Sequence, residues 1–306
     1  MLNDIAKGLL REVAELSDLP TGGAFNIRLN GQTAARSSSP NIQIITKQDK
    51  PGINIIIKPG TVETLHIPVI ISESGVKETV YNDFFIGDDC DLTIMAGCGI
   101  HNCGDEDSAH DGIHTFTVGK NAKVRYIERH YGEGEGRGKR LMNPTTVVHL
   151  AEGAYVEMEN TQISGVDDTV RKTTATLAAD STLIVREKVM TTGVQQAISD
   201  FVADMNGENC RCDIVSRTVA RDQSHQKFYS ILNGNAPCTG HTECDSILMD
   251  QASVIASPQL SATCIDASLI HEAAIGKIAG EQIIKLMTLG LTEEEAEEQI
   301  VNGFLN

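Results

Sequence analysis

Aromatic residues are scarce in this sequence of 306 residues: they make up 4% of it, and tryptophan is absent. Sugar-binding grooves rely on aromatic platforms, so this scarcity argues against an enzyme that acts on polysaccharides. No uninterrupted apolar run approaches the length of about 18 residues that a membrane span needs. The N-terminus MLNDIAKGLLREVAEL is charged and amphipathic, unlike a signal peptide. We therefore predict a cytoplasmic protein that is not bound to a membrane.

Basic residues are also few, since 25 Lys and Arg stand against 42 Asp and Glu, which gives a formal net charge of −17. Such a surface repels phosphate backbones, so nucleic acid is not an expected partner. Eight cysteines in 306 residues are too sparse for a disulfide-stapled scaffold, and a reducing cytosol keeps them as thiols. They are therefore either packing residues or ligands for metal and sulfur.

Helical periodicity is confined to the two ends of the chain. Residues 1–20 carry apolar side chains at helical spacing, namely Leu2, Ile5, Leu9, Val13 and Leu16. Residues 21–264 consist instead of short runs of β-formers, such as NIQIITK, INIIIK and TLIVREKV, and form the predicted β core. From about residue 265 to 306 the spacing becomes helical again. Within that C-terminal region Gly290 is a good C-cap, and Thr292 with Glu295 has the pattern of a capping box.

The β core contains a repeated turn in which a small or turn-forming residue recurs at nearly constant distance. The residues at this place are Cys90, Ala122, Ala154, Ser181, Asn209, Ala236 and Ala252, separated by 32, 32, 27, 28, 27 and 16 positions. A spacing of about 30 residues with two or three strands per interval favours a coiled β-solenoid. Strands of this length also occur in antiparallel sandwiches, so the repeat alone leaves both architectures open.

Metal-ligating side chains are concentrated in the segment GCGIHNCGDEDSAHDGIH. It holds Cys98, His101, Cys103, His110 and His114 within 17 residues. Thiolate and imidazole are ligands that iron and zinc prefer, although this spacing is not that of a zinc finger. The segment is therefore a candidate for metal or sulfur handling, and the alternative is a glycine-rich loop that exposes ordinary polar residues.

Two further groups of ligating residues lie nearer the C-terminus. Cys210 and Cys212 face the same side if they lie on a strand, where paired thiols usually serve as small apolar filler. Cys244 lies in GHTECDSILMD, and His271 with Glu272 follows 27 residues later. A thiolate, an imidazole and a carboxylate suffice for an iron site with open positions. The alternative is that His271 and Glu272 cap a helix.

The segments HTECDSILMDQASVIASPQL and LIHEAAIGKIAGEQIIKLMTLGLTEEEAEEQIVNGF resemble the C-terminal signature of the SufB/SufD family of iron-sulfur cluster assembly proteins. The shared elements are a Cys-Asp-Ser segment, a Pro two residues before a Leu, a His-Glu-Ala triplet and a final acidic helix that ends in Gly-Phe. The resemblance extends more weakly over residues 80–306. It implies a right-handed parallel β-helix with a helical C-terminal region, which selects the solenoid over the sandwich.

The resemblance also implies partners. In the family, pairs of subunits associate through their β-helices, and the helical tail docks onto SufC, an ABC-type ATPase whose ATP-driven dimerisation exposes the assembly site. Residues 265–306 are then the expected ATPase-docking region. A sulfur donor and apo-protein acceptors are further expected partners.

Residue by residue, the resemblance matches Cys244 to the SufB cysteine implicated in nascent cluster assembly and Glu272 to the carboxylate of the same site. His271 matches the histidine that the SufD-type partner contributes. The chain lacks the longer N-terminal region typical of SufB, and it combines all three residues, so we expect a compact SufB-like homodimer.

The expected function is a scaffold that builds a transient iron-sulfur cluster, [4Fe-4S] or [2Fe-2S], and transfers it; it is not an enzyme. A P-loop of the form GxxxxGK[ST] is absent, so ATP hydrolysis falls to the partner. Mixed thiolate, nitrogen and oxygen ligation allows the cluster to leave. The alternatives are a SufD-like stabilising subunit that binds no cluster and a β-solenoid carbohydrate-active enzyme. The sequence leaves the roles of Cys210, Cys212, Cys238 and Cys264 open.

Overall fold

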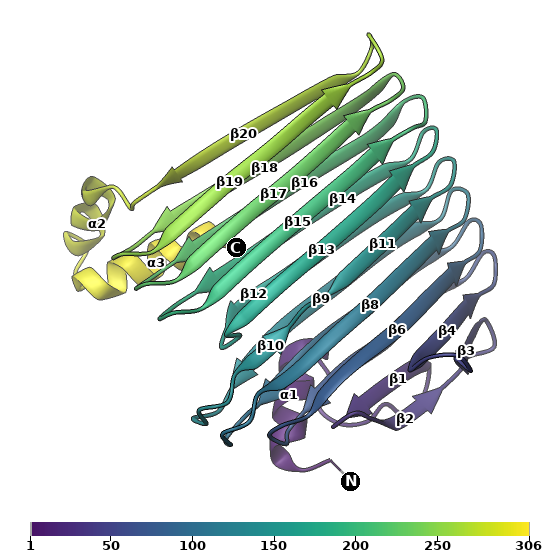
Figure 1. The fold of residues 1–306 in the computed structure, drawn as a ribbon, viewed down its shortest axis with the longest axis horizontal. Coiled ribbons are helices and arrows are strands. Elements are labelled where there is room, and N and C mark those ends of the chain that lie inside the picture. Colours follow the sequence, from purple (N-terminus) through teal and green to yellow (C-terminus); the bar gives the residue numbers. More distant parts are fainter. Residues whose placement is uncertain (1, 306) are drawn as a thin grey trace.

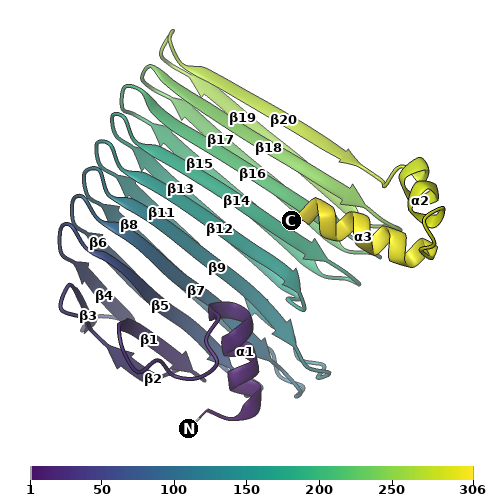
Figure 2. The ribbon, with the colours of Figure 1, turned by 180° about the vertical axis from the view of Figure 1, so that it is seen from behind.

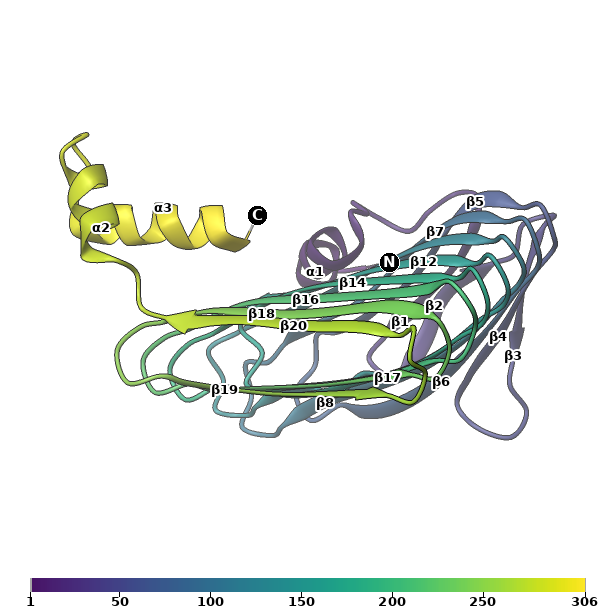
Figure 3. The ribbon, with the colours of Figure 1, turned by 90° about the horizontal axis from the view of Figure 1, so that it is seen from above.

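The computed structural model describes residues 2–305, which form a β-solenoid of about eight turns with one N-terminal and two C-terminal helices (Figure 1). The predicted solenoid is thus confirmed and the sandwich is excluded. Most turns contribute one strand to each of two sheets, which face each other across the core (Figure 3). None of the helices within residues 2–305 is long and apolar enough to cross a bilayer.

The two sheets are mostly parallel and have ten strands each. Sheet A contains β1 (Ala24–Leu29), β2 (Gln32–Ser37), β5 (Val62–Ile71), β7 (Asp91–His101), β9 (Lys123–Glu133), β12 (Tyr155–Ser164), β14 (Thr182–Thr191), β16 (Cys210–Ala220), β18 (Cys238–Leu248) and β20 (Ser268–Gly276). Sheet B contains β3 (Ile42–Thr46), β4 (Gly52–Ile57), β6 (Lys77–Ile86), β8 (Ser108–Val118), β10 (Arg140–Met142), β11 (Thr145–Leu150), β13 (Asp168–Leu177), β15 (Gln196–Met205), β17 (His225–Gly234) and β19 (Ser253–Ala262). Among the strands of residues 2–305, only β1–β2 and β3–β4 pair antiparallel.

Stacked small residues mark one edge of the solenoid. The column runs through Cys90, Ala122, Ala154, Ser181, Cys210 and Cys238, all of which are buried. The residue before four of them has a left-handed backbone and is Asp or Asn, because these side chains tolerate positive φ in tight turns. The column therefore continues through Cys210 and Cys238 instead of the expected Asn209 and Ala236. Ala252 lies at the opposite edge, between β18 and β19, which explains its anomalous spacing of 16.

Helix α1 (Asp4–Ala14) lies on the outer face of sheet A, where it contacts β5, β7 and β9 (Figure 2). Its buried residues include Leu9, Leu10 and Val13. Ile5, which the periodicity placed on the same face, is 38% exposed. The buried stripe is therefore rotated toward Leu10, because the helix docks on a flat sheet and needs a broad apolar face.

The C-terminal segment departs from the sequence-based expectation. Residues 268–276 form β20, the last strand of sheet A, so the helical region starts at α2 (Gly280–Met287), later than the expected residue 265. In-register pairing with β18 overrides the helical spacing of these residues. Helix α3 (Glu293–Leu305) begins with the expected capping box, since Thr292 and Glu295 exchange side-chain-to-backbone hydrogen bonds of 2.8 and 3.2 Å.

Helix α3 folds back over sheet A (Figure 3). It buries Val301 and Leu305 against Val219 of β16. The buried stripe of α3 is made by Ala296, Val301 and Leu305. Ile300 and Phe304 flank this stripe and are partly exposed. In contrast, α2 buries none of its residues. Helix α3 thus packs against the solenoid, whereas α2 has no fully buried side chain.

The solenoid interior holds a charged network as well as an apolar core. The guanidinium of Arg171 makes a close ion pair with Glu128, and its Nε lies 3.6 Å from Oε1 of Glu187. The hydroxyls of Ser199 and Ser216 donate to Glu187, each at 2.6 Å. Because every one of these side chains is buried, the charges depend on one another for compensation.

Candidate functional site

The last complete coil brings the predicted site residues onto two neighbouring strands. Strands β18 and β20 pair in parallel register, so Thr242 lies beside His271, Glu243 beside Glu272 and Cys244 beside Ala273. Successive side chains on a strand point to opposite faces. Cys244 and His271 therefore belong to the inner face of sheet A, and Glu272 belongs to its outer face. The structure places the three residues in one coil but divides them between the two faces.

On the inner face, the thiol of Cys244 is fully buried. Its Sγ lies 3.8 Å from the hydroxyl of Ser246. The thiol also borders a small interior cavity of about 10 Å³ that Glu187 and Ser216 help to line. Burial raises the pKa of Cys244 to about 11, opposite in direction to the lowering that a protonated neighbouring histidine would produce. At neutral pH the thiol in this closed structure is protonated.

His271 is half-buried, and its Nδ1 is a buried atom without a hydrogen-bond partner. Buried polar atoms are usually satisfied, so this nitrogen is an available ligand or acceptor at the inner face of the last coil. His271 and Glu272 lie in the middle of β20, not ahead of a helix. The reading of these residues as helix caps is therefore wrong.

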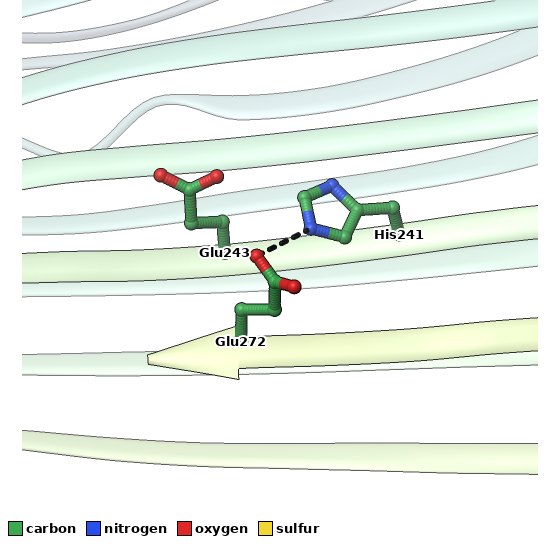
Figure 4. Close-up of side chains that lie close together, drawn as sticks. All are labelled: His241, Glu243 and Glu272. Carbon is green, nitrogen blue, oxygen red and sulfur yellow. Dashed lines mark ion pairs between the residues drawn. The ribbon is translucent and has the colours of Figure 1, made fainter. Parts of the chain in front are cut away.

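On the outer face, His241, Glu243 and Glu272 converge (Figure 4). One ligand atom from each lies within 4.8 Å of the other two, and this is the only such group of three His, Cys, Asp or Glu within residues 2–305. Nε2 of His241 is 3.8 Å from Oε2 of Glu272, and its Nδ1 is 2.8 Å from Oδ1 of Asp213 on β16. His241 and Glu243 are not among the site residues expected from the sequence. Strand alternation places both with Glu272 once the register of β18 and β20 is known.

This group lies at the end of a polar groove of about 520 Å³ on the outer face of sheet A. The groove crosses β12, β14, β16 and β18, and its walls carry Glu157, Glu159, Arg186, Asp213 and Arg217 besides His241 and Glu243. Burial raises the pKa of the Asp213 carboxyl, but hydrogen bonds from His241 and Arg186 outweigh this effect and lower the pKa below its ordinary value. The groove thus presents mixed charges rather than an apolar surface.

The second candidate, the segment from Cys98 to His114, consists mainly of two strands and not of a loop. Cys98 belongs to β7, whereas His110 and His114 belong to β8 of the other sheet. These three residues line one interior cavity of about 10 Å³ together with His130. His101 and Cys103 instead lie at the solenoid edge, where His101 Nε2 is 3.0 Å from the Cys103 Sγ. The structure therefore divides the five residues into an inner group and an edge pair.

Burial holds Cys98, His114 and His130 in their neutral forms. Burial lowers the pKa of His114 and of His130 to about 4 in each case, and it raises the pKa of the Cys98 thiol. His114 also has structural partners, since its Nδ1 lies 2.8 Å from the Tyr126 hydroxyl and its Nε2 lies 3.3 Å from the Asn82 amide. Neutral imidazoles are competent metal ligands, but these contacts already engage both nitrogens of His114.

The remaining cysteines of the C-terminal coils contribute mainly to packing. Cys210, Cys212 and Cys238 are buried members of the main hydrophobic core, and Cys264 is half-exposed. Burial raises the pKa of Cys210 to about 11 and also raises the pKa of Cys212. The expectation that Cys210 and Cys212 fill the interior is confirmed.

Comparison with known protein families identifies a relationship over most of the chain. The family model for the SUF system FeS cluster assembly SufBD core domain matches residues 84–304. An iron-sulfur cluster assembly SufBD family protein of Methanocaldococcus jannaschii is 30% identical over 244 residues, which cover 79% of this chain and 76% of that protein.

Two further proteins described as members of the same family show similar identity. The protein of Archaeoglobus fulgidus is 30% identical over 230 residues, or 75% of this chain and 61% of its own length. The protein of Methanothermobacter thermautotrophicus is 30% identical over 266 residues, which cover 83% of this chain and 62% of that protein. The chain thus spans less than two thirds of the length of these two relatives. The chain belongs to the SufBD family of iron-sulfur cluster assembly proteins.

Proposed function

We propose that this protein is a scaffold subunit on which nascent iron-sulfur clusters are assembled and from which they are transferred. The observation that carries the proposal is the position of Cys244, a thiol on the inner face of the last coil, with His271 on the adjacent strand and Glu272 one residue further. One thiolate with nitrogen and oxygen ligands holds a cluster less firmly than four thiolates. Such a mixed set suits a protein that must release its cargo.

Cluster assembly at Cys244 requires the last coil to open. The thiol is fully buried, and its pKa is raised to about 11 by that burial. Because the thiolate is the metal ligand, the site stays inactive until solvent and iron reach it. Opening also lets Cys244 and Glu272, which occupy opposite faces of sheet A, approach the same cluster.

A SufC-type ABC ATPase is the proposed source of the force that opens the coil. Helix α2 follows β20 directly and exposes Ile284 (62%) and Met287 (44%), and Leu289 beyond it is 77% exposed. Apolar side chains left uncovered on a helix favour a protein partner. Force applied to α2 passes into β20, which carries His271 and Glu272.

The second proposed partner is another copy of this chain. The last coil leaves the outer edges of β19 and β20 unpaired within residues 2–305. Unpaired strand edges are templates for pairing with another chain. Ile255, Leu260, Ile270 and Ile275 are exposed on these two strands. Edge-to-edge association through β19 and β20 produces a homodimer in which each subunit contributes Cys244, His271 and Glu272 to a shared region.

The test is the ATP-dependent accessibility of Cys244, followed by cluster transfer. The expected result is that a maleimide labels Cys244 only when a SufC-type ATPase and ATP are present, as read by peptide mass spectrometry. The loaded protein should then mature an apo-ferredoxin, and Cys244→Ser should abolish this maturation. Cys212→Ser, a change of the same kind at another buried core cysteine, is the matched control and should leave the maturation intact.

A SufD-like stabilising subunit is the second candidate, and the burial of Cys244 is the observation that favours it. A thiol with a raised pKa in a packed core is typical of structural cysteines. This candidate predicts that Cys244→Ser preserves association with the ATPase and the activity of the whole assembly. The same accessibility and transfer measurements therefore decide between the two functions.

A further inference from the structure

We propose that His241, Glu243 and Glu272 form a binding site for one divalent transition-metal ion on the outer face of sheet A (Figure 4). The geometry itself argues for the ion. Its assignment as ferrous iron, delivered for assembly at Cys244, rests on the proposed scaffold function. The site is separate from the inner-face thiol, since Glu243 and Cys244 are consecutive on β18 and point to opposite faces.

The three ligand atoms are already close to a coordinating arrangement. They lie within 4.8 Å of one another, and the distance from His241 Nε2 to Glu272 Oε2 is 3.8 Å. Ligands bound at about 2.0–2.2 Å to one ion sit roughly 3 Å apart. The two glutamates are partly or largely exposed. Small rotations of their side chains bring the three ligand atoms to coordinating distance without moving the strands.

Asp213 orients the histidine for this role. Its Oδ1 lies 2.8 Å from His241 Nδ1, and Arg186 holds its other oxygen at 2.6 Å. A hydrogen bond donated from Nδ1 to a carboxylate places the proton on that nitrogen and leaves the lone pair of Nε2 directed toward the two glutamates. A carboxylate behind a histidine in this way is the usual support of a metal-binding imidazole.

The charges around the site favour a cation. Glu243 and Glu272 lie side by side in register, and like charges on adjacent strands destabilise a sheet. A divalent ion bound between Glu243 and Glu272 compensates the electrostatic repulsion between their two carboxylates.

The donor set defines the class of ion. One imidazole nitrogen and two carboxylate oxygens suit Fe²⁺, Mn²⁺ and Zn²⁺. Three protein ligands leave positions open to water, so the ion can exchange. The adjoining groove of about 520 Å³ provides an approach from solvent. These properties fit temporary storage of an ion better than a permanent structural metal.

The experiment is a titration of the purified full-length chain with Mn²⁺, in which free Mn²⁺ is measured by electron paramagnetic resonance and Fe²⁺ competes under anaerobic conditions. We expect one ion per chain. His241→Ala and Glu243→Gln should each weaken Mn²⁺ binding at least about tenfold, and Asp213→Asn about 10- to 100-fold. Glu243→Gln conserves shape, so loss of binding in this variant is not a folding effect; circular dichroism checks each variant.

Two matched controls separate this proposal from the scaffold function. Glu157→Gln, in the same groove, and Cys244→Ser, on the inner face, should both bind Mn²⁺ as the wild type does. Unchanged binding by His241→Ala and Glu243→Gln, or no stoichiometric binding by the wild type, would overturn the site. Loss of binding in Cys244→Ser would also overturn it. If Mn²⁺ binds as expected and Fe²⁺ displaces it, but no cluster forms at Cys244, the metal site stands and the scaffold function fails.

Discussion

Removal of the Arg171 guanidinium tests whether the solenoid interior depends on compensated charge. Arg171 lies between Glu128 and Glu187, and all three side chains are at most 5% exposed. Arg171→Met keeps much of the side-chain volume but leaves two buried carboxylates without a cation. Breaking a buried ion pair by removing one partner costs about 3–5 kcal/mol. We expect a loss of this size in the free energy of unfolding.

The measurement is urea denaturation followed by far-ultraviolet circular dichroism, since the chain has no tryptophan. Hydrogen exchange of β13, which carries Arg171, locates the effect in the structure. The matched control is Arg125→Met, which removes the same group from an ion pair with Glu159 on the outer face of sheet A, where Arg125 is 54% exposed. An exposed pair contributes about 0–1 kcal/mol.

The double variant Arg171→Met with Glu128→Gln supplies a further check. Neutralising one stranded carboxylate should recover part of the lost stability, because the cost arises from uncompensated charge and not from a cavity. If Arg171→Met is no more destabilising than Arg125→Met, or if Glu128→Gln recovers nothing, the solenoid interior does not behave as a low-dielectric region that penalises unpaired charge.

Three other predictions follow from the packing. Burial lowers the folded-state pKa values of His114 and His130 to about 4. The stability that their neutral forms contribute is therefore complete above the unfolded-state pKa of about 6.5 and is lost as the pH falls toward 4, by roughly 3 kcal/mol per histidine. Urea midpoints measured as a function of pH check this loss, and a flat profile between pH 6.5 and 4 would contradict the burial of the two imidazoles. Val301→Asp should release α3 from β16 at a cost of roughly 1.5–3 kcal/mol, seen as faster proteolysis after residue 280, and unchanged protection would contradict the docking of α3. Gly165→Ala should destabilise the protein by roughly 1–3 kcal/mol in urea denaturation. Gly165 has φ +70°, and a Cβ added there would lie 1.8 Å from the carbonyl oxygen of Gly132. A neutral effect would contradict this and would mean that the turn relaxes.

The solenoid was predictable because its turns repeat in the sequence at nearly constant spacing. Each coil places a small residue after a tight turn, and stacking in register requires it at nearly constant spacing. The C-terminal boundary was not predictable from periodicity, because the residues of β20 satisfy helical spacing as well as strand pairing. Only the presence of β18 as a neighbour decides between the two. The face of α1 was misjudged at Ile5 for a similar reason, since docking on a sheet selects a different stripe.

The site was predictable in its parts but not in its geometry. The sequence singles out Cys244, His271 and Glu272 by residue type and by resemblance, yet only the register shows that Glu272 points away from Cys244. His241 and Glu243 carry no motif, and their relation to Glu272 depends on pairing between strands almost 30 residues apart. The pKa of Cys244 depends on burial, which no local pattern reveals.

The most direct test of the scaffold function is anaerobic reconstitution with ferrous iron and sulfide, with iron and sulfide analysis and Mössbauer spectra of the wild type, Cys244→Ser and Glu272→Ala. Cys212→Ser serves as the control for the loss of a buried thiol. If the protein is a scaffold, the wild type and Cys212→Ser hold a cluster and Cys244→Ser and Glu272→Ala do not. Equal cluster content in all four proteins would place the ligands elsewhere, and a wild type that holds no cluster would contradict the scaffold function.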